Sequence, residues 1–224
     1  MQRESVFQKI AADWRACFQR DPAANNWLEV LLAYPGFHAI VAHRFIHPLY
    51  RWHVPFIPRY LSHISRFLTG VEIHPGAEIQ AGLFIDHGMG VVIGETTEIG
   101  RNCTLYQGVT LGGTSLQHGK RHPTLEDNVI VGAGAGIIGA VVVGENSKIA
   151  AGAVVVRDVP PNSTVVGVPG RVVLQDGKKV EEPVIPKVDM PDPTVDAIAA
   201  LATRIEALEE RARDAESRHG TAPL

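Results

Sequence analysis

The sequence predicts an α+β chain in which a helical N-terminal domain precedes a left-handed parallel β-helix and a C-terminal helix. Three observations support this prediction. Apolar residues follow a helical spacing up to residue 70, recur every six positions over residues 71–174, and return to a heptad spacing after residue 194. Nearly all of the 22 glycines lie between Gly70 and Gly170. Glycines inside helices cost about 0.5–1 kcal/mol each, so the middle segment is not a helix bundle.

Composition excludes several classes of protein. The net charge of −3 gives no reason to expect a nucleic-acid or membrane-surface partner. No apolar run is long enough to span a membrane, and the amphipathic N-terminus lacks the apolar core of a signal peptide. Cys17 and Cys103 have neither zinc nor redox spacing, so they are predicted to be reduced core thiols of a cytoplasmic protein.

Residues 1–70 have the pattern of a helical domain. Asp21-Pro22 is typical of a helix start, with Pro in the first turn, and Pro35-Gly36 separates two apolar-periodic stretches. The last helix of the domain is predicted over the stretch IPRYLSHISRFLTG. Gly70 at its end is a suitable C-cap, and the domain is predicted to end there. The helical spacing of that last stretch links Ile57, Leu61, Ile64 and Leu68.

Residues 71–174 show the six-residue period of a hexapeptide β-helix. Each hexad supplies one short strand, and three hexads close one triangular coil with the branched residue pointing inward. Small residues often follow the branched one and let the chain turn a corner. The predicted inward residues are Ile73, Ile79, Ile85, Ile93, Ile99, Leu105, Leu111, Leu125, Val131, Ile137, Val143, Ile149 and Val155.

The six-residue period slips at two places. Two extra residues separate Ile85 from Ile93, and Asp86-His87 lies in that slip. The polar stretch GGTSLQHGKRHPT fills the longer gap between Leu111 and Leu125. Insertions in a solenoid map to loops, often on its binding face. The two slips are therefore where the sequence predicts function.

The chain after the repeat has three predicted parts. Residues 175–193 are Pro-rich and polar and are predicted to be a linker, residues 194–218 a helix, and residues 219–224 a disordered tail. A heptad seam along the helix indicates an oligomerising or docking helix; the alternative, an isolated solvated helix, would expose that seam to water. Its members are Ile198, Leu201, Ile205, Leu208, Ala212 and Ala215.

His87 is the main candidate for chemistry in the repeat. A histidine at a solenoid corner can simply cap a turn, and this reading applies to His74, His118 and His122 as well. Carboxylates distinguish His87, because Asp86 precedes it and Glu72 lies most of one coil earlier. A carboxylate fixes the tautomer of a histidine and stabilises its imidazolium, so the pattern is that of a general base. No G-x-S-x-G turn supports a covalent acyl-enzyme.

Arg121-His122 form a second polar cluster. An arginine fork on a loop suits a carboxylate or phosphate, and the alternative is a solvated loop charge. His43 and His47 are four residues apart in a helical setting, as in some metal pairs, but neither a carboxylate triad nor an HExxH pattern accompanies them. No metal site is predicted.

With these motifs in place, the sequence resembles the serine O-acetyltransferases of cysteine biosynthesis, which are hexapeptide-repeat acyltransferases. The matching stretches run from residue 20 to residue 173: RDPAA, GFHAIVAHR, EIHPGAEI, FIDHGMGVVIGET, YQGVTLGGT, GKRHPT, VGAGAGIIG and VVGVPGRVV. The resemblance implies transfer of acetyl from acetyl-CoA to the hydroxyl of L-serine. Acetyl-CoA would be a co-substrate, with no permanently bound cofactor.

The resemblance also implies roles for single residues. His87 would be the general base, oriented by Glu72 at a position where many members have Asp. Asp21 and Asp86 would hold the serine ammonium, and Arg121-His122 its carboxylate.

Two further sets of residues are implied by the resemblance. Backbone N–H groups near Gly112-Gly113 would stabilise the oxyanion. Acetyl-CoA would lie along the later coils, where small residues admit its pantetheine arm and basic residues meet its phosphates. The residues concerned are Gly113, Thr114, Ala133, Lys148, Ala151 and Arg171.

Assembly and partners follow from the same resemblance. Active sites of the family lie between neighbouring β-helices, so a homotrimer or a dimer of trimers is expected, and the short helical N-terminus is compatible with a trimer alone. L-cysteine is an expected feedback inhibitor, because it offers the same ammonium and carboxylate. The chain ends TAPL, whereas members that bind cysteine synthase end in Ile, which argues against that complex.

Three alternative functions make different demands on these residues. A hexapeptide acetyltransferase acting on a sugar or another hydroxyl compound would not need Arg121 for its acceptor. A hydratase of the γ-carbonic anhydrase type would bind zinc through histidines of neighbouring β-helices. A non-catalytic solenoid would be indifferent to replacement of His87.

Overall fold

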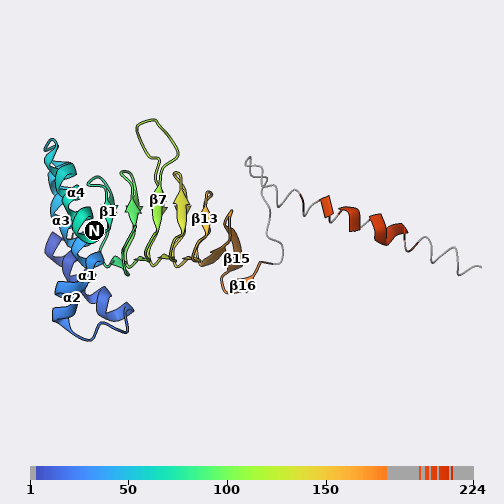
Figure 1. Cartoon of the computed structure of the whole chain (residues 1–224), viewed down its shortest axis with the longest axis horizontal. Helices are drawn as coiled ribbons and strands as arrows, with labels where there is room; N and C mark the ends of the chain where they lie inside the picture. Colours follow the sequence, from blue (N-terminus) through green and yellow to red (C-terminus); the bar gives the residue numbers. More distant parts are fainter. Residues whose placement is uncertain are drawn as a thin grey trace, which may run out of the picture. The chain divides into compact units, whose positions relative to one another are not determined.

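The computed structural model describes residues 4–180 together with Ala197, residues 200–201, 203–205 and 207–211, and Arg213 (Figure 1). The chain divides into two compact units, residues 1–183 and residues 184–224. The N-terminal helices and the β-helix therefore belong to one unit, and the second unit is described separately.

The N-terminal helices are α1 (Val6–Arg20), α2 (Trp27–Ala33), α3 (Pro35–Arg51) and α4 (Ile57–Thr69). α1 begins at a capping box, in which the Gln8 N–H donates to Ser5 Oγ at 3.2 Å and the Ser5 N–H donates to Gln8 Oε1 at 2.8 Å. The predicted helix start at Asp21-Pro22 is wrong, because Asp21 is the residue after the end of α1. Its carboxylate accepts the Ala23 N–H at 2.8 Å, so the short polar side chain closes a turn between two helices.

The start of α3 and the end of α4 agree with the prediction. Pro35 lies in the first turn of α3, and Gly70 ends α4 with a φ of +72°, a left-handed conformation that glycine adopts readily. The predicted apolar stripe of α4 stays at the surface of the chain, since Ile57 is 50% exposed and Leu68 is 74% exposed. The residues that α4 buries are Pro58, Ser62 and Thr69.

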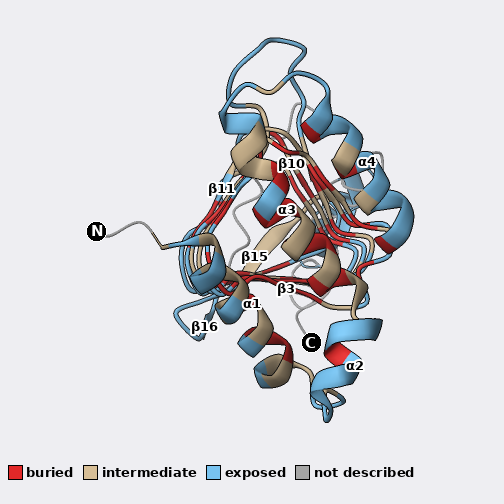
Figure 2. Ribbon diagram, turned by 90° about the vertical axis from the view of Figure 1, so that its left-hand side faces the viewer, coloured by how far each residue is buried: buried red, intermediate tan, exposed pale blue. Residues whose placement is uncertain are grey.

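The middle of the chain is a parallel β-helix whose coils pass through three sheets in turn (Figure 2). The first sheet contains β1 (Glu72–Ile73), β4 (Val92–Ile93), β7 (Thr110–Gly112), β10 (Gly136–Ile138) and β13 (Val154–Val155). The second contains β2 (Glu78–Ile79), β5 (Glu98–Ile99), β8 (Thr124–Leu125) and β11 (Val142–Val143). The third contains β3 (Phe84–Ile85), β6 (Thr104–Leu105), β9 (Ile130–Val131), β12 (Lys148–Ile149), β14 (Ser163–Val166), β15 (Arg171–Gln175) and β16 (Lys178–Lys179).

The predicted inward residues stack in three columns inside the coils, which confirms the six-residue period. Their pairing in register is unbroken across both slips, so the extra residues are accommodated outside the strands. None of the stacked residues is more than 5% exposed, and burying each stabilises the fold by about 1.5–3 kcal/mol. The columns are Ile73, Ile93, Leu111, Ile137 and Val155; Ile79, Ile99, Leu125 and Val143; and Ile85, Leu105, Val131 and Ile149.

The three sheets meet at three edges. The His87 edge, between the third and first sheets, comprises residues 86–91, 106–109, 132–135 and 150–153. The Arg121 edge, between the first and second sheets, comprises residues 74–77, 94–97, 113–123 and 139–141. The asparagine edge, between the second and third sheets, comprises residues 80–83, 100–103, 126–129 and 144–147.

The asparagine edge has the predicted small residues after the inward ones, since a side chain at Gly100 or Gly144 would collide with the next coil. It also has asparagines, which were not predicted. Asn102, Asn128 and Asn146 adopt φ values of +56°, +60° and +58°, which asparagine tolerates better than most residues. Their side chains also join successive coils, since Asn128 Nδ2 donates to Asn146 Oδ1 at 3.1 Å. In the later coils asparagine thus occupies the left-handed position that Gly82 occupies in the first coil, and it adds a hydrogen bond between coils.

A buried ion pair fixes the helices to the first coil. Asp13 of α1 is fully buried and accepts from Arg44 of α3 at 3.0 and 3.1 Å. The same carboxylate accepts the Gly82 and Leu83 N–H groups, at 2.8 and 3.1 Å. Arg44 in turn donates to the Gln80 carbonyl at 2.6 Å. One network therefore joins two helices and a turn of the β-helix, and both charges are paired and hydrogen-bonded.

The C-terminal end of the repeat differs from the predicted domain boundaries. β15 runs antiparallel to β14 and β16 antiparallel to β15, so residues 175–180 of the predicted linker belong to strands and turns of this unit. The remainder of the linker, both ends of the predicted helix and the predicted disordered tail lie outside the described residues.

In the second unit, the described residues between Ala197 and Arg213 are helical, as predicted. In the described part of the chain, no helix combines the length and apolar character needed to cross a membrane.

Candidate active site

Asp86 and His87 occupy the first slip of the period, at the His87 edge after β3. His87 has a φ of +57°, and the glycine after it a φ of +76°. Non-glycine residues seldom adopt such a conformation outside strained or functional turns. The His87 side chain is 74% exposed, and its Nε2 lies 4.0 Å from Asp86 Oδ1. The turn thus presents the imidazole outward, with a carboxylate beside it.

The start of α3 supports this turn from behind. A side chain at Gly36 would collide with the backbone of Ile85, so α3 can approach the third sheet only with glycine at this position. The N–H of Gly36 also lies close to Gly88 in the turn. Phe84 packs outward from the third sheet into a cluster with α1 and α3 that includes Phe37. The helical domain therefore sets the conformation of the Asp86-His87 turn.

Asp21 is held near the same helix start. The Tyr34 hydroxyl donates to Asp21 Oδ2 at 2.5 Å, and Tyr34 directly precedes the first turn of α3. Burial and this hydrogen bond raise the pKa of the Tyr34 hydroxyl, so it remains a donor at neutral pH. Arg20, the neighbour of Asp21, donates to the Cys103 carbonyl at 2.8 Å and so attaches the end of α1 to the third sheet.

Glu72 lies at the His87 edge, but it does not contact His87. Its N–H donates to the Val91 carbonyl at 2.8 Å, which places the start of β1 beside the end of the His87 turn. Its carboxylate is instead paired with Arg66 at 3.2 Å and Arg59 at 3.6 Å, both on α4. These three residues line a hollow of about 260 Å³. The predicted Glu72–His87 contact therefore stays a prediction.

Arg121 lies in the long insertion at the Arg121 edge. Its guanidinium forms an ion pair with Glu95, whose other oxygen accepts the Tyr50 hydroxyl at 3.0 Å. The hydrogen bond from Arg121 lowers the pKa of Glu95 and so keeps it ionised. The guanidinium also donates to the Gly119 carbonyl at 3.5 Å. Because an arginine has five N–H donors in a planar fork, donors remain for an anion.

His122 is held by the backbone and side chain of Thr96. The Thr96 N–H donates to His122 Nδ1 at 3.3 Å, and Thr96 Oγ1 lies 3.0 Å from the same atom. Nδ1 is therefore an acceptor, and Nε2 carries the proton. Burial, and then the charge of Arg121, lower the pKa of His122, so a neutral ring with an Nε2–H donor is favoured.

Glycines and Thr96 give the second cluster its shape. A side chain at Gly94 would collide with the His122 ring, and one at Gly113 would come within 3.1 Å of its Nε2. Thr96 Oγ1 also accepts the N–H groups of Arg121 and His122, at 3.0 and 3.2 Å. Sequence reasoning missed Thr96 and Glu95, because nothing in the repeat distinguishes them from other polar residues of a solenoid. It also missed Tyr50, which lies in α3 outside the repeat.

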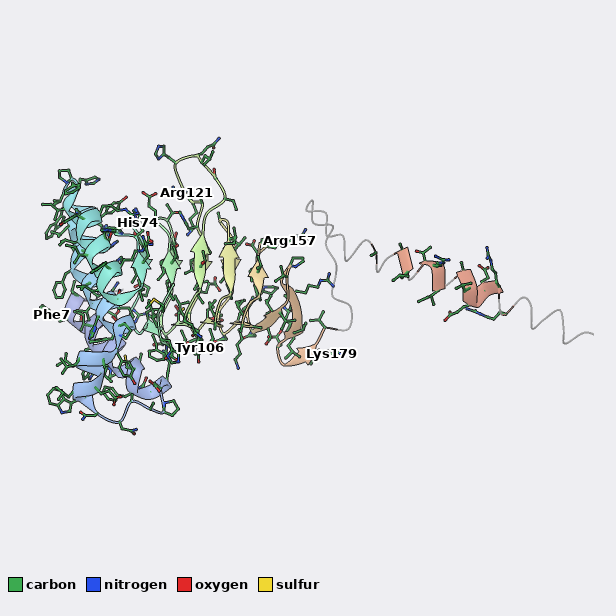
Figure 3. The ribbon with its side chains drawn as sticks, viewed as in Figure 1. Phe7, His74, Tyr106, Arg121, Arg157 and Lys179 are labelled. Carbon is green, nitrogen blue, oxygen red and sulfur yellow. The ribbon has the colours of Figure 1, made fainter. Side chains whose placement is uncertain are left out.

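The two clusters lie at different edges of the β-helix. Tyr106 follows Leu105 as Asp86 follows Ile85, and these strands pair in register, so Tyr106 marks the His87 edge. Figure 3 shows Tyr106 and Arg121 at opposite edges of the coils. Within one chain the structure brings Asp21, Asp86, His87 and Glu72 to one side, and Arg121 and His122 to another.

The residues predicted to contact acetyl-CoA divide in the same way. Ala133 and Ala151 lie at the His87 edge, where the Gly152 N–H donates to the Ala133 carbonyl at 2.9 Å. Gly113 and Thr114 begin the insertion at the Arg121 edge. Lys148 in β12 and Arg171 in β15 belong to the third sheet, which leads to the His87 edge.

Three other histidines, His43, His47 and His74, have structural roles, and both cysteines are buried. His43 Nε2 bonds to the Ala77 carbonyl at 3.1 Å and His47 Nδ1 to the Pro75 carbonyl at 2.9 Å, so both fasten α3 to the first coil. His74 Nδ1 accepts the Gly76 N–H at 3.0 Å and caps a turn. Among the described residues, no three His, Cys, Asp or Glu side chains are grouped as metal ligands. Burial raises the pKa of both buried thiols, Cys17 and Cys103, to about 12.

Comparison with known proteins gives consistent matches. Residues 1–42 match the family described as serine acetyltransferase, N-terminal, and residues 122–157 match the bacterial transferase hexapeptide family. The chain is 59% identical over 206 residues to a serine acetyltransferase of Synechococcus elongatus, covering 92% of this chain and 84% of the relative. A serine acetyltransferase of Bacillus subtilis is 52% identical over 212 residues, covering 95% and 97%.

Solved structures agree with these matches. The structure of Neisseria gonorrhoeae serine acetyltransferase in complex with serine has a TM-score of 0.73 and 45% identity, covering 75% of this chain and 69% of that one. A serine acetyltransferase in complex with cysteine has a TM-score of 0.74 and 41% identity, covering 76% and 70%. With the hexapeptide match, this likeness confirms that the β-helix is left-handed.

Proposed function

The chain belongs to the serine acetyltransferase family, and we propose that it transfers acetyl from acetyl-CoA to the hydroxyl of L-serine at a site shared by two neighbouring chains. The observation that carries this proposal is the division of the polar residues between two edges of one β-helix. An acceptor with an ammonium and a carboxylate needs both clusters, and two copies of the chain can bring the His87 edge of one against the Arg121 edge of the other.

Opposite charges on the two clusters suit the two charges of serine. Asp21 and Asp86 supply carboxylates for the ammonium group. Arg121 supplies the free part of its guanidinium fork, and His122 its Nε2–H, for the carboxylate of serine. Together they place the serine hydroxyl beside His87, which is a positional contribution to catalysis.

In the proposed reaction, His87 is the general base. Its unprotonated ring nitrogen takes the proton of the serine hydroxyl while the oxygen attacks the thioester carbonyl of acetyl-CoA. The tetrahedral oxyanion then collapses, the C–S bond breaks, and the imidazolium returns the proton to the CoA sulfur. Backbone N–H groups near Gly112-Gly113 are the candidate oxyanion donors. Products are O-acetylserine and CoA, so no covalent enzyme intermediate is needed.

Glu72 is proposed to orient His87 and to stabilise its imidazolium. The placement of the β1 start beside the His87 turn supports this role. Since the Glu72 carboxylate is paired with Arg66 and Arg59, it would have to turn from α4 towards the imidazole when the site is assembled. The long arm of Glu, compared with Asp, gives it room to do so.

Acetyl-CoA is proposed to lie between the same two chains. Ala133 and Ala151 of one chain would leave room for the pantetheine arm, and Gly113 and Thr114 of the neighbouring chain would face it. Lys148 and Arg171 would meet its phosphates. A homotrimer provides this arrangement at every interface, and the exposed apolar stripe of α4 is compatible with such contacts.

Two further properties are proposed. L-cysteine would inhibit by competing with serine, because it carries the same ammonium and carboxylate. A cytoplasmic location agrees with two free, buried cysteines. The C-terminal residues that bear on binding to cysteine synthase lie outside the described part of the chain.

Thr96 is expected to act through Arg121 and His122 as a positioning residue. Thr96→Val keeps the shape of the side chain but removes the hydrogen bonds of its hydroxyl to both residues, and leaves the one from its backbone N–H to His122. We expect the KM for L-serine to rise about five- to thirtyfold, because lost hydrogen bonds cost about 1–2 kcal/mol, with little change in kcat. Thr96→Ser should restore the KM. A Val variant with normal KM, or one that loses only kcat, would contradict this role.

The proposed function is tested by following CoA thiol release from acetyl-CoA with different acceptors. L-serine should give turnover, and sugars or no acceptor should give only background. Turnover with a sugar would indicate the sugar acetyltransferase alternative, and turnover that needs no acceptor would exclude the proposal. A chelator should leave serine-dependent turnover unchanged, whereas a zinc hydratase would release no CoA at all.

A further inference from the structure

The helix of the second unit carries an apolar seam that the proposed reaction does not use. Leu201, Ile205 and Leu208 follow one another at spacings of four and three residues on the described helix. They are 59%, 55% and 55% exposed. The printed sequence continues the spacing with residues 198, 212 and 215, outside the described residues. Large apolar side chains at heptad positions indicate a seam for other helices.

Charges beside the seam indicate what those other helices are. With Ile205 at heptad position a and Leu208 at d, Arg204 falls at g and Glu209 at e. In a parallel, in-register coiled coil, a g residue faces the e residue five positions later on the neighbouring helix. Arg204 of one copy would therefore face Glu209 of the next. Arg211 repeats the pattern with a Glu five positions later in the printed sequence.

The opposite orientation is disfavoured by the same charges. In an antiparallel pair, e faces e and g faces g, which would set Glu209 against Glu209 and Arg204 against Arg204. Within one chain, Glu209 makes a contact with Arg213 at 3.8 Å, with side chains 63% and 77% exposed. Such an exposed ion pair contributes little to the stability of the helix, so Glu209 remains available to a neighbouring helix.

We propose that this helix associates with the same helix of other copies of the chain as a parallel, in-register coiled coil. A seam of about three heptads that ends in alanines is too short to hold free chains together at micromolar concentration. Chains already joined elsewhere present their helices to one another at effective millimolar concentration, and the seam then closes. The helix thus tightens an existing oligomer. The proposal rests on the proposed assembly and does not depend on the proposed reaction.

Disulfide trapping in the full chain tests the seam. Leu208→Cys places a thiol at a d position, where equivalent residues of parallel helices meet. The two native cysteines are buried, so the new thiol is the accessible one. On mild oxidation with oxidised glutathione, linked dimers should form at least about tenfold faster than with Glu210→Cys, which lies at f on the opposite face. Equal rates, or no linked dimer from either Leu208→Cys or Leu201→Cys, would overturn the proposal.

Charge reversal tests the orientation. In the Leu208→Cys chain, Arg204→Glu should slow trapping several-fold, because it sets Glu against Glu209 of the neighbour. Adding Glu209→Arg should restore the rate, since the reversed pair attracts again. If Arg204→Glu leaves the trapping rate unchanged, or if adding Glu209→Arg does not restore that rate, the parallel register is excluded. Serine acetylation, measured on each variant, should stay within about twofold, so failure of the seam is distinguishable from failure of the proposed function.

Discussion

Replacing His87 with Ala is expected to lower kcat for serine acetylation by about 10²–10⁴-fold, the usual contribution of a general base. The reason is positional. His87 is presented by a left-handed turn, with its side chain 74% exposed. In the described coils, the His87 edge contains no second histidine that could take over the proton. The measurement is steady-state thiol release with L-serine varied, and the KM for serine should change much less than kcat.

A matched control separates chemistry from folding. His118 is an exposed histidine in the insertion at the Arg121 edge, and His118→Ala should leave kcat unchanged. If His87→Ala stays within about tenfold of the parent while binding serine normally, the general base lies elsewhere, even if serine is the acceptor.

Replacing Arg121 with Ala is expected to raise the KM for L-serine about 10- to 150-fold. The variant removes charge-assisted hydrogen bonds to the serine carboxylate, which are each worth about 1.5–3 kcal/mol. The KM for acetyl-CoA should change little, because the thioester lies away from this cluster. Serine and acetyl-CoA titrations of the same preparation give both values.

The conservative variant sharpens this result. Arg121→Lys keeps the positive charge but loses the planar fork, so its KM for serine should fall between those of the parent and Arg121→Ala. An Arg121→Ala chain with unchanged serine KM would show that the acceptor carboxylate binds elsewhere. It would also favour an acceptor without a carboxylate.

The β-helix could be predicted from the sequence because its rule is local. Each inward position, such as Ile93 or Leu111, is set by its own hexad. Residues at corresponding positions of successive coils then pair in register, as Ile93 does with Leu111. The start of α2 could not be predicted in this way. Asp-Pro is typical both of a helix start and of a turn. Here the Asp21 carboxylate accepts the Ala23 N–H and closes a turn, while the Tyr34 hydroxyl, from a distant segment, holds the same carboxylate.

The candidate site could be predicted only in part. Departures from the period identified the Asp86-His87 turn and the insertion with Arg121. The partners of those residues depend on contacts between distant segments. Glu95 reaches Arg121 across the insertion, and Glu72 meets Arg66 only because α4 packs beside β1. No spacing in the sequence encodes such contacts.

The central claim, that one active site takes residues from two chains, is tested most directly by mixing two impaired variants, with L-serine kept below the KM of the parent so that each variant alone has little activity. His87→Ala and Arg121→Ala chains are co-expressed in equal amounts, and the specific activity of the mixed oligomers is compared with that of each variant alone. In a mixed assembly, about a quarter of the interfaces should pair an intact His87 with an intact Arg121 from the neighbour, so about a quarter of the parental activity should return. Activity no higher than that of the two separate variants would show that both clusters act within one chain and would contradict the shared site.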